Sequence, residues 1–392
     1  MIRKKGITIL ILFLLLCATG ALHSQNAKPE DATQSFEQLA AGAEAALEAE
    51  QVPEAIRLYS RATALRPTWS EGWWHLGTLQ FDSGHFLEAR NAFQHFVSTE
   101  HREPGPGFGM LGLSEFQLKH YTAALPALER SVSLGLGSNP EFTHSVLYHD
   151  GILNSFLGRP EIAIVRLILL ANEIAAAHPE APKDAVLGDL QLLDAFGVAA
   201  LRKHELPSEI PPAQVPLVRK AGRAQAFIAL QDLVTARAEF KELLTLYPAE
   251  PGVHYSYGVF LLKEAPAEAI DEFRRELEIS PSDAVTRIQL ALQLERTGDF
   301  DQGLKYATAA VALAPKDFVA HVACSRLWLA KNKNEQAVSE ARIAVKLSPK
   351  SPDAHFALSR ALEATGRNAE AMRERTEFQR LKAEADQTAG KQ

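Results

Sequence analysis

A period of 34 residues runs through most of this chain of 392 residues. Ser325 is followed 12 positions later by Ala337, and 34 positions earlier the small residues Ala291 and Gly303 stand at the same spacing. The pattern returns 34 positions after Ser325. A chain with such a period folds as stacked copies of one small unit, because each copy can bury its apolar surface only against its neighbours.

Residues 318–351 show what one copy forms. The first half has apolar residues at helical rather than alternating spacing, namely Val319, Val322, Ala323, Leu327 and Leu329. The polar run 331–334 predicts a turn, and a second apolar series follows it, with Ala337, Val338, Ala341, Ala344 and Val345. Pro349 ends this second helix, because a helix interior excludes proline. Each unit is therefore predicted to be two helices joined by a turn, with essentially no β-sheet in the chain.

Small residues mark nine such units between Phe36 and about Leu381. In the first helix they are Ala43, Gly77, Gly112, Gly151, Ala224, Gly258, Ala291, Ser325 and Ser359. In the second helix they are Ala55, Ala89, Ala124, Ala163, Ala236, Ala269, Gly303, Ala337 and Ala371. Glycines that follow the first series by seven residues are expected in turns, and they are Gly84, Gly158, Gly298 and Gly366.

This pattern resembles the tetratricopeptide repeat (TPR), whose signature is W-x2-L-G followed by alanine, an aromatic residue and proline. The best match is Trp73-Trp74-His75-Leu76-Gly77 with Ala89 and Phe93. The resemblance implies an all-α, right-handed superhelical solenoid of about nine helix-turn-helix units. It also implies a concave groove that binds a protein or a peptide.

The repeat is interrupted once, which gives the expected domain organisation. Residues 36–178 form an N-terminal block of four units, and residues 217–383 form a C-terminal block of five. Between them, Ala185–Arg202 is predicted to be one extra amphipathic helix, and Glu205–Pro216 has too many prolines for a helix. The segment 179–216 is either a joint between two superhelical blocks or a decayed tenth unit. The glycine-rich run Gly105–Gly109 is expected to be a loop.

The first 24 residues differ from the rest of the chain. Arg3, Lys4 and Lys5 precede the run 7–16, which is apolar except for Thr8. Such a start is typical of a secretory signal peptide, and the apolar run is short for a membrane-spanning helix. We expect periplasmic or secreted protein with no membrane insertion after cleavage. The alternatives are an uncleaved segment anchored in the inner membrane and a lipoprotein attached through Cys17.

Charge and residue types exclude several function classes. Without its first 24 residues the chain has 38 basic and 48 acidic residues, which does not suit nucleic acid. Cys324 would then be the one remaining cysteine and is expected to be a buried packing thiol. The 13 histidines form no metal-binding motif, and no nucleophile motif or phosphate-binding loop is present. We therefore predict no enzyme activity, no metal site and no cofactor; the sequence does not indicate an oligomeric state.

The resemblance places the exposed flank of each first helix on the concave surface. Aromatic residues on that flank are the candidate binding residues, namely Trp74, Phe81, Phe116, Tyr148, Phe156 and Tyr255. The alternative is that some of these rings only pack between neighbouring helices. Glu37, Glu44 and Glu48 at the N-terminal end favour a ligand with lysine or arginine at one end.

Two functions fit these observations. The first is a non-catalytic scaffold of the bacterial cell envelope that holds a protein or peptide segment in its groove. The alternative is an accessory or regulatory subunit of an exported enzyme that acts on the cell wall.

Overall fold

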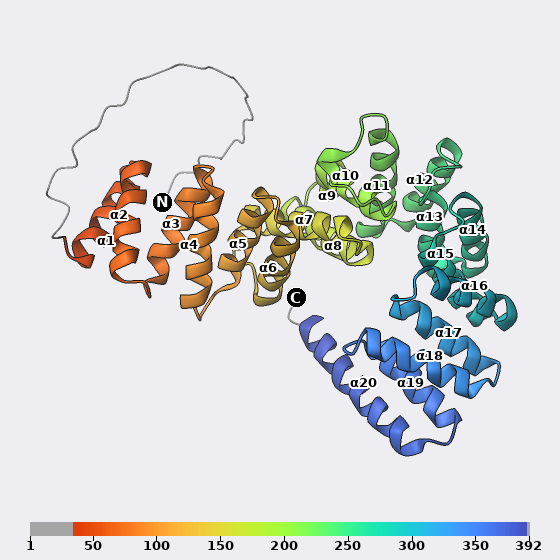
Figure 1. Ribbon diagram of the computed structural model, residues 1–392. Coiled ribbons are helices and arrows are strands. Elements are labelled where there is room, and N and C mark those ends of the chain that lie inside the picture. Colours follow the sequence, from red (N-terminus) through yellow and green to blue (C-terminus); the bar gives the residue numbers. More distant parts are fainter. Residues whose placement is uncertain (1–33, 390–392) are drawn as a thin grey trace.

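The computed structural model describes residues 34–389. The predicted signal peptide, residues 1–24, lies outside that range. The described residues form helices and no strand. Eighteen of the helices pair as nine hairpins, as the sequence predicted (Figure 1). The N-terminal hairpins are α1 Phe36–Glu48 with α2 Val52–Leu65, α3 Ser70–Asp82 with α4 Phe86–Thr99, α5 Gly105–Gln117 with α6 Tyr121–Leu134, and α7 Pro140–Phe156 with α8 Pro160–Ala177.

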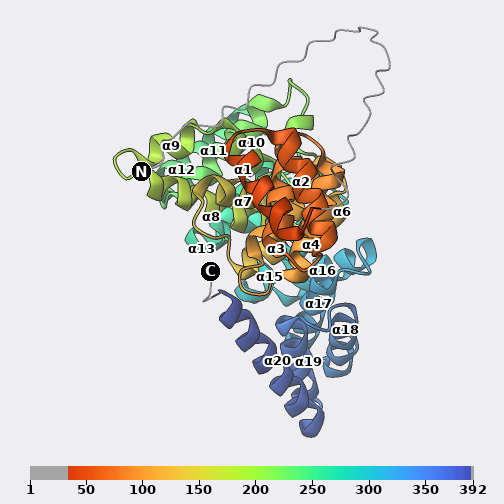
Figure 2. The same cartoon turned by 90° about the vertical axis from the view of Figure 1, so that its left-hand side faces the viewer.

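After an insertion, five further hairpins follow. They are α11 Val215–Ala229 with α12 Leu233–Leu246, α13 Val253–Glu264 with α14 Pro266–Ile279, α15 Ala284–Thr297 with α16 Phe300–Leu313, α17 Phe318–Ala330 with α18 Asn334–Leu347, and α19 Pro352–Ala364 with α20 Asn368–Ala389. Figure 1 shows the hairpins stacked along an arc, and Figure 2 shows the C-terminal helices extending below the N-terminal ones. The all-α solenoid predicted from the period is thus confirmed.

The small residues bring the two helices of a hairpin close together. A Cβ atom added to Gly258 would lie 2.6 Å from the Phe273 ring, and one added to Gly77 would lie 2.7 Å from the Phe93 ring. Both phenylalanines are fully buried. A larger residue in the first helix would therefore displace the ring that fills the hairpin core.

The predicted turn glycines have the backbone conformation that favours glycine. Gly84, Gly158, Gly298 and Gly366 have φ of 77°, 80°, 85° and 76°. Side chains with a Cβ atom rarely adopt such angles. The first helix of each of these hairpins therefore ends where a glycine allows a positive φ, and the glycine can be recognised in the sequence.

The expectation of a loop at Gly105–Gly109 was wrong, because this run is the first turn of α5. A Cβ atom on Gly105 would lie 2.0 Å from the carbonyl oxygen of Gly135, and one on Gly107 would lie 2.2 Å from the Phe96 ring. The glycines therefore permit close packing inside a helix. Pro106 fits there because the first helical turn does not need its N–H.

The insertion contains two helices where one was expected, α9 Pro182–Gly188 and α10 Leu190–Ala200. The Asp189 side chain accepts the N–H of Leu192 at 3.0 Å and so starts the second helix. A short 3₁₀ helix, η2 Pro207–Glu209, follows, and α11 already begins at Val215 with Pro216 in its first turn. Proline in a first turn does not prevent a helix.

Helix α10 packs against both blocks. Its residues Leu193 and Phe196 share a core with α7 and α8. Val198, and Leu201 one residue past the end of the helix, share a core with α11 to α14. The crossing with α11 is close, because a Cβ atom on Gly197 would lie 1.8 Å from the Val218 carbonyl oxygen. The insertion is thus part of the solenoid core.

Candidate functional site

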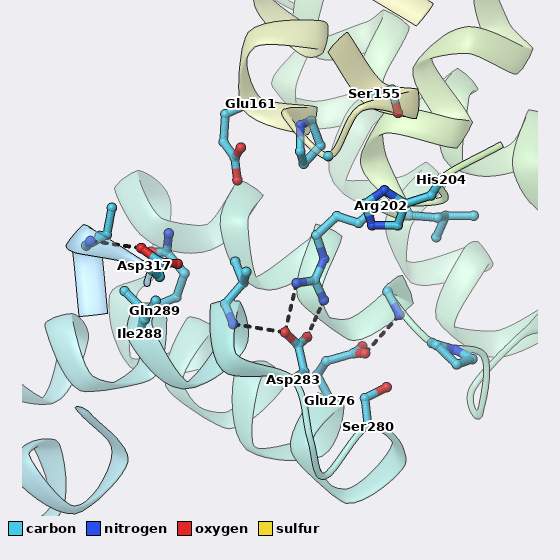
Figure 3. A pocket seen from close by; sticks show the side chains of 17 residues that line it. Ser155, Glu161, Arg202, His204, Glu276, Ser280, Asp283, Ile288, Gln289 and Asp317 are labelled. Atoms are coloured by element: carbon cyan, nitrogen blue, oxygen red, sulfur yellow. Dashed lines mark hydrogen bonds and ion pairs between the residues drawn. The ribbon is translucent and has the colours of Figure 1, made fainter. Parts of the chain in front are cut away.

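A cleft of about 690 Å³, which we call the bend cleft, opens on the described part of the chain (Figure 3). It lies where the turn between α7 and α8 approaches the start of α15 and of α17. The loops after α10 and before α13 complete its wall. Segments far apart in the sequence therefore build it, and the bend of the solenoid brings them together.

Arg202, just past the end of α10, forms the floor of the bend cleft. Its Nη1 donates to Oδ1 of Asp283 at 3.0 Å, and its Nη2 donates to the other carboxylate oxygen. Its guanidinium also lies over the Tyr255 ring, 3.7 Å from the ring centroid. The Arg202 and Asp283 side chains are 16% and 12% exposed, so the pair is largely shielded from water. Figure 3 shows this pair joining the insertion to α15.

Asp283 also begins α15. Its Oδ1 accepts the backbone N–H groups of Val285 and Thr286 at 3.0 and 3.2 Å, as an N-cap residue does. Burial by itself would raise the pKa of Asp283, but the bonds from Arg202 and Thr286 outweigh burial and hold that pKa below its usual range. The floor of the cleft is therefore an ionised pair at neutral pH.

Glu276, near the end of α14, is a second carboxylate in the wall and is fully buried. Its two oxygens accept the N–H groups of Gly252 at 2.9 Å and of Tyr255 at 3.2 Å. These groups belong to the N-terminus of α13, where the helix dipole stabilises negative charge. Glu276 therefore fixes α13 to α14, and each of its two oxygens already accepts a backbone hydrogen bond.

The rim of the bend cleft has two further carboxylates, Glu161 on α8 and Asp317 before α17. Glu161 is exposed and has no partner within residues 34–389. One oxygen of Asp317 accepts the N–H of Val319 at 2.8 Å, and the other oxygen is free among the described contacts. With Asp283 and Glu276, four carboxylates line a cleft whose basic side chains are Arg202 and His204.

A narrow slot of about 50 Å³ adjoins the bend cleft and shares Pro160, Glu161 and Arg202 with it. We call it the side slot. Gln225 and Ser256 line it, and both are buried. The amide nitrogen of Gln225 donates to Oγ of Ser256 at 3.4 Å, and the amide oxygen accepts no bond in the part of the chain that the structure describes.

Within residues 34–389 no cluster of histidine, cysteine and carboxylate side chains could hold a metal ion. Cys324 is buried, as predicted, and burial raises its pKa to about 12, so its thiol is protonated at neutral pH. Over the same residues, no helix combines the length and the apolar character that a membrane crossing requires.

The aromatic residues predicted from the sequence lie in separate places. Trp74 lines a hollow of about 630 Å³ between α3, α4 and the loop before α5. Its ring is half-buried and packs on Phe96 at 5.2 Å. Glu71 and Glu100 lie on the same hollow.

The structure brings Phe116 and Tyr148 together in another hollow, of about 450 Å³, which α5, α7, α8 and the insertion surround. Phe116 contacts His149 edge to face at 4.5 Å, and burial lowers the pKa of that histidine. Phe156 joins this group through Tyr121, with ring centroids 5.2 Å apart.

The other two predicted residues contribute less open surface. Phe81 is half-buried and packs edge to face on Phe86 at 5.3 Å. Tyr255 is 6% exposed, because Arg202 covers its ring, and it lines the side slot.

The sequence did not indicate Arg202, Asp283 or Glu276 as site residues. A weak signal existed for two acids, because Asp283 and Asp317 each follow a proline by two residues and precede a helical series. That signal predicts a helix start. It contains no information about Arg202, which is 81 residues away from Asp283 in the chain.

Comparisons with known proteins agree with the repeat. The sequence matches the tetratricopeptide repeat family at residues 40–97, 222–284 and 325–375. These stretches fall on the hairpins α1–α4, α11–α14 and α17–α20. Tetratricopeptide repeats form scaffolds with extended binding surfaces. The comparison with curated protein sequences finds no match.

Several solved structures resemble parts of the chain. MamA from Desulfovibrio magneticus RS-1 is 19% identical, covers 43% of this chain and 97% of its own, and has a TM-score of 0.39. YrrB, described as a TPR protein with an unusual peptide-binding site, is 17% identical, covers 44% of this chain and 90% of its own, and has a TM-score of 0.37. The Cut9–Hcn1 hetero-tetramer of APC/C is 14% identical, covers 88% of this chain and 66% of its own, and has a TM-score of 0.35. The family assignment rests on the sequence matches, each of which coincides with consecutive hairpins, and by that evidence the chain is a tetratricopeptide repeat protein.

Proposed function

We propose that this protein is a non-catalytic scaffold of the bacterial cell envelope that holds a peptide or protein segment in the bend cleft. The observation that carries this proposal is the bend cleft itself, an open space of about 690 Å³ whose floor residues are already fixed by ion pairs and backbone hydrogen bonds. Ligand sites in proteins have volumes of this order. A pre-organised floor lowers the entropy lost on binding.

The hollow of Phe116 and Tyr148 supports the same function. Half-buried aromatic side chains with polar neighbours are the residue types that contribute most to interface energy. Asp189, Gln191 and Ser208 of the insertion provide the polar edge of this hollow. A segment that leaves the bend cleft along α7 would meet these rings next.

Export is part of the proposal and rests on the basic start and apolar run of residues 3–16. Intact-mass measurement on protein from the native host is expected to show a chain that starts between Leu22 and Gln25. A full-length, soluble cytoplasmic species would contradict this part.

Blocking the bend cleft tests the function. Gln289 on α15 is half-buried in the cleft lining, so Gln289→Trp would fill the space, whereas Gln379→Trp on exposed α20 is the matched control. Tagged full-length protein would be purified from the native host, and its partners quantified by mass spectrometry. We expect at least a tenfold loss of partners with the first variant only. Unchanged partners would refute the cleft as the site.

The same experiment distinguishes the alternative role. Several envelope proteins lost together would favour a scaffold. One stoichiometric cell-wall enzyme would favour an accessory subunit. Enzyme activity in the purified chain alone would contradict both.

A further inference from the structure

We propose that the bend cleft selects a basic side chain, arginine or lysine, of an extended peptide segment. The cation would lie between Glu161 and Asp317, and the adjoining main chain would reach the side slot. This inference rests on the proposed function and names the chemistry of the partner.

The charge of the cleft favours a cation. Arg202 is the one arginine in the lining, which contains no lysine, and both of its terminal nitrogens donate to Asp283. His204 is the other basic side chain of the lining, so the imidazole is the one group there that could accompany a carboxylate or a phosphate. Glu276 adds a buried carboxylate whose partners at hydrogen-bond distance are backbone N–H groups. The field of the lining thus attracts positive groups and repels negative ones.

The rim has the groups that would contact the cation. Figure 3 shows the Glu161 side chain extending from α8 into the open space, with Asp317 below it on the same side of Arg202. Glu161 offers both oxygens, and Asp317 offers the oxygen that does not cap α17. Two carboxylates facing one space can share a guanidinium or an ammonium group, because each such cation has several donors.

The side slot provides an independent observation. Gln225 is 6% exposed, yet its amide oxygen has no donor among the described residues. The oxygen lies in a slot that opens beside Glu161, where a backbone N–H of a bound peptide would satisfy it. A peptide carries a basic side chain and main-chain N–H groups together, so one ligand could reach both the rim and the side slot.

The test begins with selection from a random dodecapeptide phage library on the full-length protein. We expect enrichment of arginine or lysine. Labelled synthetic peptides from the selection would then be measured by fluorescence anisotropy, each beside a version with citrulline in place of arginine. Citrulline keeps the shape and lacks the charge. We expect at least tenfold weaker binding of the citrulline peptide.

Matched variants locate the effect. Glu161→Gln with Asp317→Asn removes the rim charges and keeps a capping residue at position 317; we expect at least tenfold weaker binding. Glu88→Gln with Glu180→Gln removes the same charge from exposed positions elsewhere and should change binding less than twofold. Gln225→Leu should weaken the peptide severalfold. Circular dichroism would verify that each variant is helical.

The outcomes separate the inference from the proposed function. Selected peptides that lack basic residues, or that bind the rim variant as tightly as the wild type, would overturn the inference and leave a scaffold with another specificity. Spermidine binding tighter than any selected peptide would make the cleft a small-cation site and would also overturn it. Selection of no peptide at all would count against both the inference and a peptide-binding scaffold.

Discussion

Replacing Arg202 by alanine tests how the insertion supports the C-terminal block. The substitution removes both hydrogen bonds to Asp283 and the contact of the guanidinium with the Tyr255 ring. Asp283 then keeps its two backbone bonds at the start of α15, but its charge loses the cation beside it. The variant therefore leaves a largely buried carboxylate without a counter-charge.

The size of the effect follows from burial. Removing one member of a buried ion pair costs about 3–5 kcal/mol. A desolvated cation–π contact adds up to about 2 kcal/mol, although the two losses are not additive. We expect Arg202→Ala to lower the free energy of unfolding of the surrounding hairpins by about 3–5 kcal/mol. The matched control is Arg219→Ala, which removes an equally bidentate pair with Asp194; because Arg219 is 37% exposed, about 1 kcal/mol or less is expected.

The assay must resolve parts of the chain, because a solenoid need not unfold in one step. Native-state hydrogen exchange of the full chain measures local opening in α13 to α16 for the wild type and both variants. A double-mutant cycle with Asp283→Asn isolates the pair, since asparagine keeps the N-cap. We expect a coupling energy of at least about 1.5 kcal/mol.

Two results would refute this reasoning. A coupling energy below about 0.5 kcal/mol would mean that the pair contributes little despite its burial. A loss of protection spread evenly from α1 to α20 would mean that the effect is not local, contrary to a chain in which each repeat contacts only its neighbours.

Three further predictions follow from single positions. Gly258→Leu should lower the free energy of unfolding by about 3 kcal/mol or more, because a Cβ atom at this position would already lie 2.6 Å from the Phe273 ring. Gly366→Ala meets open space and should lower it by about 1 kcal/mol, because the backbone there has a φ of 76°. Urea unfolding of the two variants compares these costs. The hydrogen bond with the Glu272 carboxylate raises the pKa of His254. The stability that this pair contributes is therefore complete below about pH 6.5 and is lost as pH rises through the raised pKa. The free energy of unfolding should be lower at pH 8.5 than at pH 6, and His254→Gln should make this difference smaller. The double substitution Trp74→Ala and Tyr148→Ala should weaken partner capture about tenfold, while the circular dichroism spectrum stays helical. Unchanged capture would mean that neither the Trp74 hollow nor the hollow of Phe116 and Tyr148 binds the partner.

The hairpins could be predicted because their signals are local. Apolar spacing defines each helix, and a turn glycine such as Gly298 is required by its own φ of 85°. The run Gly105–Gly109 could not be predicted in the same way, because glycine serves both turns and close contacts. Its role depends on the Gly135 carbonyl and the Phe96 ring, whose positions are set by the stacking of hairpins.

The site could be predicted only in part, for a related reason. Residue type and register identified Phe116 and Tyr148, which the structure places in one hollow. The pair of Arg202 and Asp283 depends on the path of the insertion, which has no repeat to define it. Whether the predicted aromatic residues bind a partner stays a prediction.

A position that the period did not reveal links successive units. Four residues before the small residue of the first helix, His254, His321 and His355 each bring one ring nitrogen to within 3.0–3.1 Å of the carbonyl of the preceding proline. Their other ring nitrogens contact glutamates of the second helix at 2.6 Å. Trp73 donates to the Pro67 carbonyl from the same register position. Different side chains thus bond the same carbonyl, that of the proline two residues after the second helix, and so tie the first helix of the next hairpin to the turn that precedes it.

The packing of α10 bears on how the bend cleft keeps its shape. A Cβ atom on Gly222 would lie 1.8 Å from the Leu193 carbonyl oxygen, and one on Gly252 would lie 2.7 Å from the Leu201 carbonyl oxygen. The backbone of α10 and of the residue after it is therefore in direct contact with α11 and with the start of α13. A hinge motion at this segment would have to break these backbone contacts and pull α10 away from one of the two hydrophobic cores to which it contributes. A ligand that requires the bent arrangement would instead stabilise it, since binding to the folded state raises its stability by mass action.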